Sequence, residues 1–203
     1  MELKFQTDQN KFQLLLKMTN IFRASYSVLS IWASGDYQRA VESYFKLKEY
    51  TSPQMEAGKR MHEEWKAEVD KTKCLPKIFG GKKLSNPQTE LKIERKLDDW
   101  LELVGVIDVY DNQTIIDYKT GVKSSEAYAS DFQKNVYQIL KPKATRAEFY
   151  RFDQYQNEVD VSVVHLTDKT LKDGLNWVLT LASDMHHYLT KNDLYQQLGD
   201  EVE

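Results

Sequence analysis

Polar and apolar residues alternate with two different spacings along this chain, a helical spacing in the first part and a strand-like spacing later. Apolar residues recur every three or four positions on a half-buried helix and every second position on a half-buried strand. Helical spacing is found at Asp8–Met18 and in a stretch that begins near Ser25 or Ser27 and continues past Gly35 to about Tyr50. We expect both stretches to be helices.

A third helix has a clearer start signal. Ser52 followed by Pro53 supplies an N-cap and a first-turn proline, so a helix is predicted from there to about Val69. One stripe of this helix consists of Met55, His62, Trp65 and Val69. This spacing places His62 on the side that faces the core.

After a lysine-rich segment, Lys71–Pro87, which we expect to be a long exposed loop, the spacing changes to that of strands. Strands are predicted at Gln88–Arg95, Trp100–Tyr110, Gln113–Lys119, Arg146–Phe152 and Glu158–Leu166. Helices are predicted from Ser125 to Leu140 and, capped by Thr167, to about Lys191. This order predicts an α/β (α+β) fold, with a central mixed sheet and helices on both faces.

Length and composition favour one domain over residues 1–203, in which a helical part of about 1–70 packs on a sheet core of about 88–190. The 28 basic and 31 acidic side chains nearly balance, so nucleic acid could be held only by a local cluster of positive charge or through a metal ion. The start of the chain lacks the apolar core of a signal peptide, and no stretch is apolar enough for a membrane span. We therefore expect a cytoplasmic protein with no membrane partner.

Candidate chemistry is concentrated in the hairpin around Asp111–Gln113. Side chains alternate along a strand, so Asp117 and Lys119 share one face. If the turn consists of Asn112 and Gln113, Asp108 lies directly opposite Asp117, whereas a slip of one residue would separate them. Two carboxylates about 4 Å apart repel by about 4 kcal/mol at an effective dielectric constant of 20, so the pair favours a bound proton or a divalent cation.

The segment GVIDVYDNQTIIDYKTG, Gly105–Gly121, resembles the RecB-type nuclease signature of the PD-(D/E)XK superfamily. The proline of that signature is Ile107 here. The resemblance implies a restriction-endonuclease-like core and a metal-dependent nuclease, with Asp108, Asp117 and Lys119 as catalytic residues and the Tyr118 carbonyl as a further metal ligand.

Three flanking motifs resemble the same group, in the same order. They are SYSVLSIW from Ser25, GKRMH ending at His62, and QKNVY from Gln133 to Tyr137. The resemblance implies that His62 is a metal ligand and that Gln133 and Tyr137 line the path of the nucleic acid, as does Ser25.

A further acidic residue of such sites is matched by Glu94 or, less well, by Glu90. The expected cofactor is Mg²⁺ or Mn²⁺. Relatives in CRISPR adaptation carry a four-cysteine iron–sulfur cluster, but this chain has only Cys74, so we expect a member without a cluster. His186 and His187 have no acidic partners in a ligand pattern, and we interpret them as packing or surface residues.

The resemblance is to exonuclease-type members, so it implies an exonuclease from a bacterium, an archaeon or a phage, which acts on DNA that is single-stranded or has free ends, in recombination, repair or phage DNA metabolism. A helicase or recombination protein is a possible partner. The alternative is a non-catalytic nucleic-acid-binding or assembly subunit that keeps the fold. A third interpretation, a polar stripe that only stabilises a structural domain, is the weakest.

Overall fold

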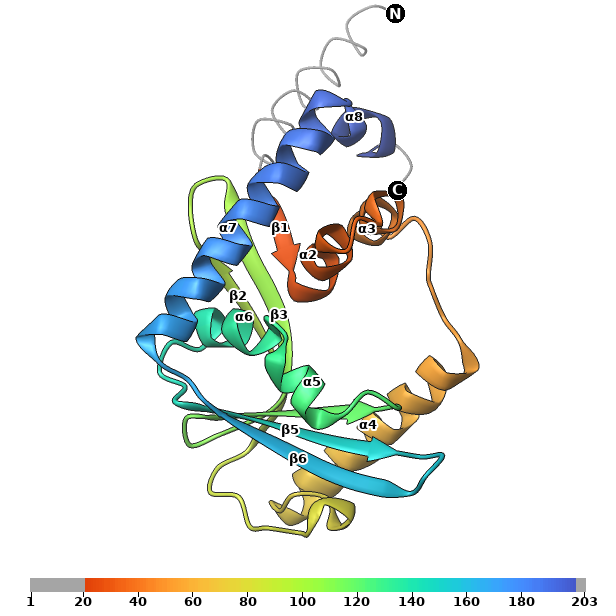
Figure 1. Ribbon diagram of the computed structural model, residues 1–203, viewed down its shortest axis with the longest axis vertical. Helices are drawn as coiled ribbons and strands as arrows, with labels where there is room; N and C mark the ends of the chain where they lie inside the picture. The colour runs from red at the N-terminus through yellow and green to blue at the C-terminus, as the bar shows by residue number, and fades with distance from the viewer. Residues whose placement is uncertain (1–20, 200–203) are drawn as a thin grey trace, which may run out of the picture.

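A six-stranded mixed sheet forms the centre of the computed structural model, which describes residues 21–199 (Figure 1). β2 (Gln88–Lys96) pairs antiparallel along one edge of the long central strand β3 (Leu101–Asp111). The other edge of β3 is shared by two strands. β1 (Phe22–Ser25) pairs parallel with residues 101–104, and β4 (Thr114–Thr120) pairs antiparallel with residues 109–111. Residues 105–108 lie between these two partners and open a fork in the sheet.

Beyond β4, the sheet continues with two further strands. β5 (Arg146–Asp153) runs parallel to β4, and β6 (Glu158–His165) returns antiparallel to β5 in an uninterrupted register. All five strands predicted from the alternating pattern are confirmed to within one or two residues at each end.

Helices cover both faces of the sheet, as predicted (Figure 1). They are α2 (Tyr26–Ala33), α3 (Tyr37–Tyr44), α4 (Pro53–Thr72), α5 (Ser125–Ser130), α6 (Gln133–Leu140), α7 (Asp168–Lys191) and α8 (Leu194–Gly199). α2, α6 and α7 bury the main core against one face, whereas α4 buries a second core against the other. None of the helices between residues 21 and 199 combines the length and the apolar character needed to cross a membrane.

The N-terminal helix predictions need correction. Asp8–Met18 lies outside the described residues. The helix expected from Ser25 or Ser27 to about Tyr50 is divided into α2 and α3. A strand, β1, precedes them, and its residues Phe22 and Ala24 are fully buried beside β3. α2 ends at Ala33, and Gly35 then takes a φ of +85°, which favours glycine and stops the helix.

The helix predicted from Ser125 to Leu140 is also divided. Asp131 adopts an extended backbone (φ −67°, ψ 160°) between α5 and α6. The break lets α6 start at Gln133 in a new direction, with six consecutive buried residues from Asn135 to Leu140. By contrast, α4 starts at Pro53 with the predicted Ser52 cap, and α7 starts after the predicted Thr167 cap.

The lysine-rich segment is exposed only in part. Leu75, Phe79 and Leu84 belong to the second core, and residues Lys77–Phe79 form a turn of 3₁₀ helix, η1. The lysines between these residues are exposed. The expectation of a wholly exposed loop is therefore wrong for its apolar residues, which fasten the segment to the sheet.

Candidate active site

The β3–β4 hairpin sets the register of the two candidate aspartates. Its turn consists of Asn112 and Gln113, both with positive φ (43° and 67°), as in the two-residue turns that suit the twist of antiparallel strands. The paired residues are Asp111 with Thr114, Tyr110 with Ile115, and Val109 with Ile116. The predicted turn and its register are both confirmed.

The ladder ends one step before the aspartates. Continued by one pair, it would place Asp108 opposite Asp117. Instead the strands separate, and Asp108 Oδ2 accepts a hydrogen bond of 2.7 Å from the backbone N–H of Tyr118. The alternation of β3 shifts here too, since Ile107 lies in the main core and Val109 in the second. The predicted direct cross-strand pair is therefore corrected to a link through the Tyr118 backbone, at the fork of the sheet.

Alternation along β4 separates Tyr118 from its neighbours, as predicted. The Tyr118 ring points into the second core, where it stacks on Phe79 with ring centres 5.4 Å apart. Asp117 and Lys119 point to the other face, where Asp117 Oδ2 lies 2.6 Å from Lys119 Nζ. An acid and an amine are thus held together beside Asp108.

Asp117 is almost completely buried, with 1% of its surface exposed. Its Oδ1 lies 3.3 Å from the Gln133 amide nitrogen and 3.2 Å from the Tyr137 hydroxyl. Burial raises the pKa of Tyr137 well above 10, so this hydroxyl stays protonated and donates a hydrogen bond to the Asp117 carboxylate. Burial also raises the pKa of Asp117; the Asp108 charge adds to this rise, and Lys119 opposes it.

Lys119 is held as a cation. Burial alone would lower the pKa of its amine, but the attraction of Asp117, aided by their hydrogen bond and by Asp108, raises it above the usual 10.5. The Lys119 ammonium also lies 5.4 Å from the centre of the Tyr128 ring. At neutral pH the site therefore presents a fixed ammonium next to a buried acid.

Helix α4 brings His62 to the same place. His62 Nδ1 lies 3.7 Å from Asp108 Oδ2, and its ring packs near Trp65. Gly58, one turn earlier, lets the helix approach the end of β4, because an added Cβ would lie only 2.6 Å from Thr120 Oγ1. The predicted stripe is confirmed for Trp65 and Val69, which are buried, whereas Met55 is exposed and His62 lies at the rim of the second core.

The two residues expected to line the substrate path lie against Asp117 itself. Gln133 donates to the Tyr137 hydroxyl at 2.8 Å, and both side chains reach Asp117 Oδ1. Both also line a cavity of about 700 Å³. Gly105 permits this arrangement, since an added Cβ there would meet Leu140 at 2.6 Å.

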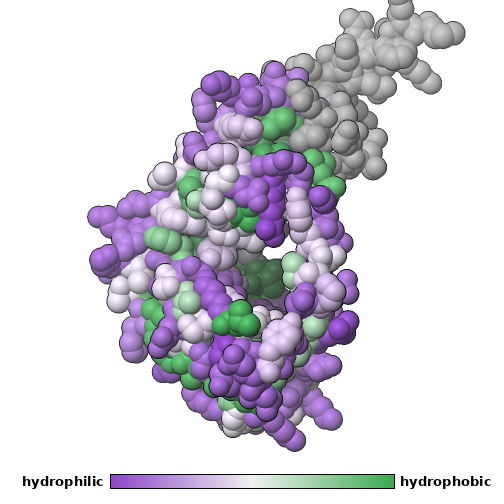
Figure 2. Space-filling view, turned by 45° about the vertical axis from the view of Figure 1, so that its right-hand side comes forward, coloured by the Kyte–Doolittle hydropathy of each residue, from purple (hydrophilic) through white to green (hydrophobic). Residues whose placement is uncertain are grey.

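That cavity lies at the fork of the sheet, and Figure 2 shows a hollow with apolar surface at its base. Its walls include apolar side chains, three tyrosines and three cations, the last being Arg23, Lys46 and Lys92. Ser25 also lines it and caps α2, with its Oγ 3.4 Å from the Val28 nitrogen. The candidate residues Ser25, Gln133 and Tyr137 thus meet in one cavity next to Asp117.

The two possible additional acids lie in different places. Glu94 pairs with Arg23 at the wall of the large cavity. Glu90 lines a smaller cavity of about 430 Å³ together with Gly58, His62 and Thr120. In the β2–β3 register Glu90 falls opposite Asp108, and its φ of +44° marks a distortion at that point. The geometry therefore favours Glu90, which the sequence motif had placed second.

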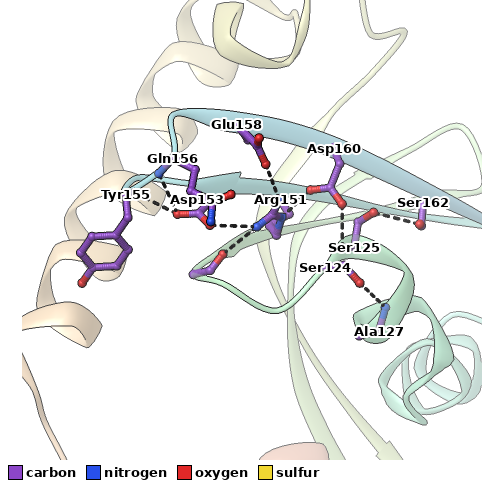
Figure 3. A network of polar contacts seen from close by, with 11 residues as sticks. Ser124, Ser125, Ala127, Arg151, Asp153, Tyr155, Gln156, Glu158, Asp160 and Ser162 are labelled. Atoms are coloured by element: carbon purple, nitrogen blue, oxygen red, sulfur yellow. Dashed lines mark hydrogen bonds and ion pairs between the residues drawn. The ribbon is translucent and has the colours of Figure 1, made fainter.

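A network that the sequence did not indicate fixes the loop after Lys119 (Figure 3). Arg151 is nearly buried, forms ion pairs with Asp153 and Asp160, and donates to the carbonyl of Gly121 at 3.2 Å. Asp160 in turn accepts the N–H of Ser125 at the start of α5. No local motif identifies such a network, because its members are brought together only when β5 pairs with β4.

The side chains around Asp117 include oxygen and nitrogen donors of the kinds that divalent cations bind. Within residues 21–199, no three His, Cys, Asp or Glu side chains are arranged as a metal-binding cluster. However, the buried Asp117 Oδ2 has Lys119 Nζ at 2.6 Å as its partner and, within the same range, no other hydrogen-bond donor, and Asp108, at the fork, has 23% of its side chain exposed. Two neighbouring carboxylates supply the oxygen ligands that a hard cation such as Mg²⁺ or Mn²⁺ prefers, and the ion would share Asp117 Oδ2 with the Lys119 ammonium.

His186 and His187 lie away from this site. His186 stacks on Trp100, and its Nδ1 is 2.8 Å from the Tyr195 hydroxyl, while His187 is exposed. Their interpretation as packing and surface residues is confirmed.

Comparison with known proteins gives a match in structure alone. No family model and no curated protein matches the sequence. An exonuclease from Laribacter hongkongensis, solved in complex with dAMP, superposes with a TM-score of 0.57 at 10% identity, covering 89% of this chain and 95% of that one. A putative exonuclease from Eubacterium rectale gives 0.54 at 16% identity, covering 82% of each chain.

A phage-related exonuclease from Haemophilus somnus gives a TM-score of 0.51 at 12% identity, covering 79% of this chain and 83% of that one. Solved exonucleases are thus structural neighbours of this chain, which shares their fold. At such low identity the likeness concerns the fold, and the residues of the site have to be argued from their own geometry.

Proposed function

We propose that this chain is a metal-dependent deoxyribonuclease that hydrolyses phosphodiester bonds at DNA ends. The observation that carries the proposal is the group formed by Asp108, Asp117 and Lys119 at the fork of the sheet. It joins a buried carboxylate to a fixed ammonium 2.6 Å away, beside a cavity large enough for part of a DNA strand.

Asp108 and Asp117 would hold the cation, with His62 and the Tyr118 carbonyl as further ligands and Glu90 near them. A divalent ion at such a site neutralises phosphate charge and lowers the pKa of a bound water. Gln133 and Tyr137 orient Asp117 through its Oδ1, so Oδ2, which pairs with Lys119, is the oxygen that would meet the cation. Orienting contacts of this kind fix a ligand in one geometry.

Lys119 would act on the phosphate and the attacking water. Its ammonium is fixed by Asp117 and by the Tyr128 ring, so it can stabilise the negative charge that develops as the water oxygen bonds to phosphorus. The bond between phosphorus and the leaving oxygen then breaks, and the proton of the water passes to solvent or to that leaving oxygen. The DNA strand is thus cut at one phosphodiester bond.

DNA is the favoured substrate for two reasons. The Laribacter neighbour was solved with dAMP, a deoxynucleotide, and the cavity of this chain combines cations with tyrosine rings. Cations bind phosphates and aromatic rings stack on bases, which is how single strands are bound without sequence preference. The rival, a non-catalytic subunit with the same fold, is disfavoured because it has no need of a buried acid paired with a lysine.

The test is a digestion assay with end-labelled linear DNA, single- and double-stranded, and with a closed circle of the same sequence. We expect degradation of the linear DNA with Mn²⁺ or Mg²⁺, no degradation in chelator, and an intact circle. Cleavage of the circle would replace exonuclease by endonuclease. Failure to cut any DNA or RNA with either ion would favour the non-catalytic subunit.

A further inference from the structure

The lysine loop, residues 71–84, carries five lysines, Lys71, Lys73, Lys77, Lys82 and Lys83, and no acidic residue. The residues that follow the loop, from Ser85 to Thr89, include no acidic residue either. Elsewhere the chain has 23 of its 28 basic side chains against all 31 acidic ones, so positive charge is concentrated in this segment. All five lysines are exposed. The ion pairs formed by lysines in the described part of the chain involve other lysines.

The backbone of the loop is fixed. The Leu75 N–H donates to Lys82 O at 2.8 Å, and the Leu84 N–H donates to Lys73 O at 2.9 Å, so the two ends of the loop pair like a hairpin. The N–H groups of Ser85 and Asn86 then donate to the buried carboxylate of Asp111. A loop fastened in this way presents its lysines at set positions, which reduces the ordering needed when a ligand binds.

The loop is also attached to the strand that bears the candidate site. Phe79 of the loop stacks on Tyr118, with ring planes only 6° apart, and Tyr118 lies between Asp117 and Lys119. Any ligand held by the lysines is therefore held in a fixed relation to β4. The nearest acids form no ion pair with the loop lysines in the described residues: Glu68 accepts the Lys77 backbone N–H, and Asp70, which also attracts Lys73, is bound by Thr89 and Lys66.

From this geometry we infer that the lysine loop is a second nucleic-acid contact, which binds the phosphate backbone of the DNA whose end enters the active site. This inference rests on the proposed function for the identity of its ligand. Several exposed cations on one fixed segment without acidic residues can bind a polyanion whose charges are regularly spaced, such as the phosphate backbone of DNA. Contacts of lysines with phosphates do not depend on the base sequence. The chemical class of ligand is the sugar-phosphate backbone of a duplex or of a strand.

The test compares the triple variant Lys77→Ser/Lys82→Ser/Lys83→Ser with the matched control Lys143→Ser/Lys172→Ser/Lys191→Ser, which removes three exposed lysines elsewhere. Binding of a labelled 30-base-pair duplex is followed by fluorescence anisotropy in chelator, over a range of salt concentration. Each phosphate contact contributes about 0.9 to the slope of log affinity against log salt. Between 50 and 200 mM salt, wild type should therefore lose about 40-fold more affinity than the loop variant.

The control and the triple Lys→Arg loop variant should keep the wild-type slope. An equal change of slope in the loop variant and the control would overturn the inference, as would undetectable duplex binding by the wild-type protein. Binding of poly-glutamate as tightly as DNA would show an unspecific polyanion surface instead. Because the assay contains no metal, its result is independent of whether the protein cuts DNA.

Hydrolysis then separates the two proposals. If the chain is a nuclease, the loop variant should cut a five-nucleotide single strand at the wild-type rate, while the KM for a long duplex rises and kcat stays the same. A loss of kcat on the short strand would contradict the role of the loop as a distant contact.

Discussion

At the residue scale, the two aspartates have different surroundings and hence different roles. Asp117 is buried and contacts Gln133, Tyr137 and Lys119, whereas Asp108 is held by one backbone N–H and faces His62. Asp117 is thus the oriented acid of the site, and Asp108 completes the pair. The sequence motif identified both positions, but it could not show that the strands separate between them, because that depends on how β1 and β4 share one edge of β3.

A first prediction concerns the charge of Asp108 without metal. The pKa of Asp117 is raised in the folded protein, so its ionisation costs stability as pH rises through that raised pKa, and part of this cost is due to Asp108. In chelator at pH 8, Asp108→Asn should melt higher than wild type by roughly 2–4 °C, for a gain on the order of 1 kcal/mol. The difference should shrink as pH falls through the raised pKa of Asp117.

Saturating Mn²⁺ should reverse that ranking in the thermal melts. An ion that binds only the folded state adds about 2.7 kcal/mol at a hundred times its dissociation constant, and Asp108→Asn would lose most of this gain. If the variant melts lower in chelator and gains as much from Mn²⁺ as wild type does, the two aspartates do not share a cation.

A second prediction concerns Tyr137. Since its hydroxyl donates to Asp117 Oδ1, Tyr137→Phe should weaken Mn²⁺ binding as well as hydrolysis, by about 10–100-fold, the usual effect of losing an orienting contact behind a ligand. Calorimetric titration with Mn²⁺ measures the first effect. Unchanged Mn²⁺ affinity with reduced hydrolysis would assign Tyr137 to the substrate path alone, as the sequence motif suggested.

At the element scale, close approaches of helices to the sheet determine where the side chains of the site lie. Gly58 brings α4 against Thr120, and Gly105 brings α6 against β3. The glycine of the GKRMH motif is therefore needed for packing, because it allows the close approach of α4 to β4 that positions His62. The sequence predicted α4 with its cap, but the distance between the helix and the strand follows from tertiary packing.

A third prediction tests this approach. Gly58→Ala should destabilise the protein by about 1–3 kcal/mol, the usual cost of overpacking, and should weaken Mn²⁺ binding, because the added methyl group lies 2.6 Å from Thr120 Oγ1. Adding Thr120→Ala removes that oxygen and should restore most of both losses. Additive losses in the double variant, measured by denaturant unfolding and Mn²⁺ titration, would show that the two residues do not press on each other.

The loop after Lys119 depends on the Arg151 network. Burial acts to raise the pKa of Asp160, but its hydrogen bonds with Arg151 and Ser125 outweigh burial and lower the pKa below 3.8. Stability from this pair is therefore present above pH 4 and is lost as pH falls through the lowered pKa. The stability that the network contributes should therefore depend on pH.

The fourth prediction is that Arg151→Met lowers stability at pH 7 by about 2–3 kcal/mol, less than a fully buried pair because Asp160 is partly exposed. The loss should shrink below pH 4, which denaturant unfolding at several pH values would detect. A loss that is the same at pH 3 and pH 7 would attribute the effect to packing of the arginine stem.

At the scale of the whole molecule, much of the fold and part of the site could be predicted from the sequence. Strands with a clear alternation, such as β2, were predicted nearly to the residue, and so was the two-residue turn at Asn112. Features that require distant segments were missed. The short strand β1 is stabilised by its pairing with β3 and by the burial of Phe22 and Ala24 in the main core, and the apolar residues of the lysine loop pack against α4 and the sheet. The fork and its cavity follow from that arrangement.

The most direct measurement is the rate of Mn²⁺-dependent hydrolysis of end-labelled linear DNA by Asp117→Asn, alongside the control Asp99→Asn, which changes a carboxylate that is almost fully exposed. Loss of a group that holds or stabilises charge at an active site commonly costs 10²–10³-fold in rate. The account predicts a fall of at least about 100-fold for a folded Asp117→Asn protein and an unchanged rate for Asp99→Asn. A folded Asp117→Asn protein that cuts DNA at the wild-type rate would contradict it.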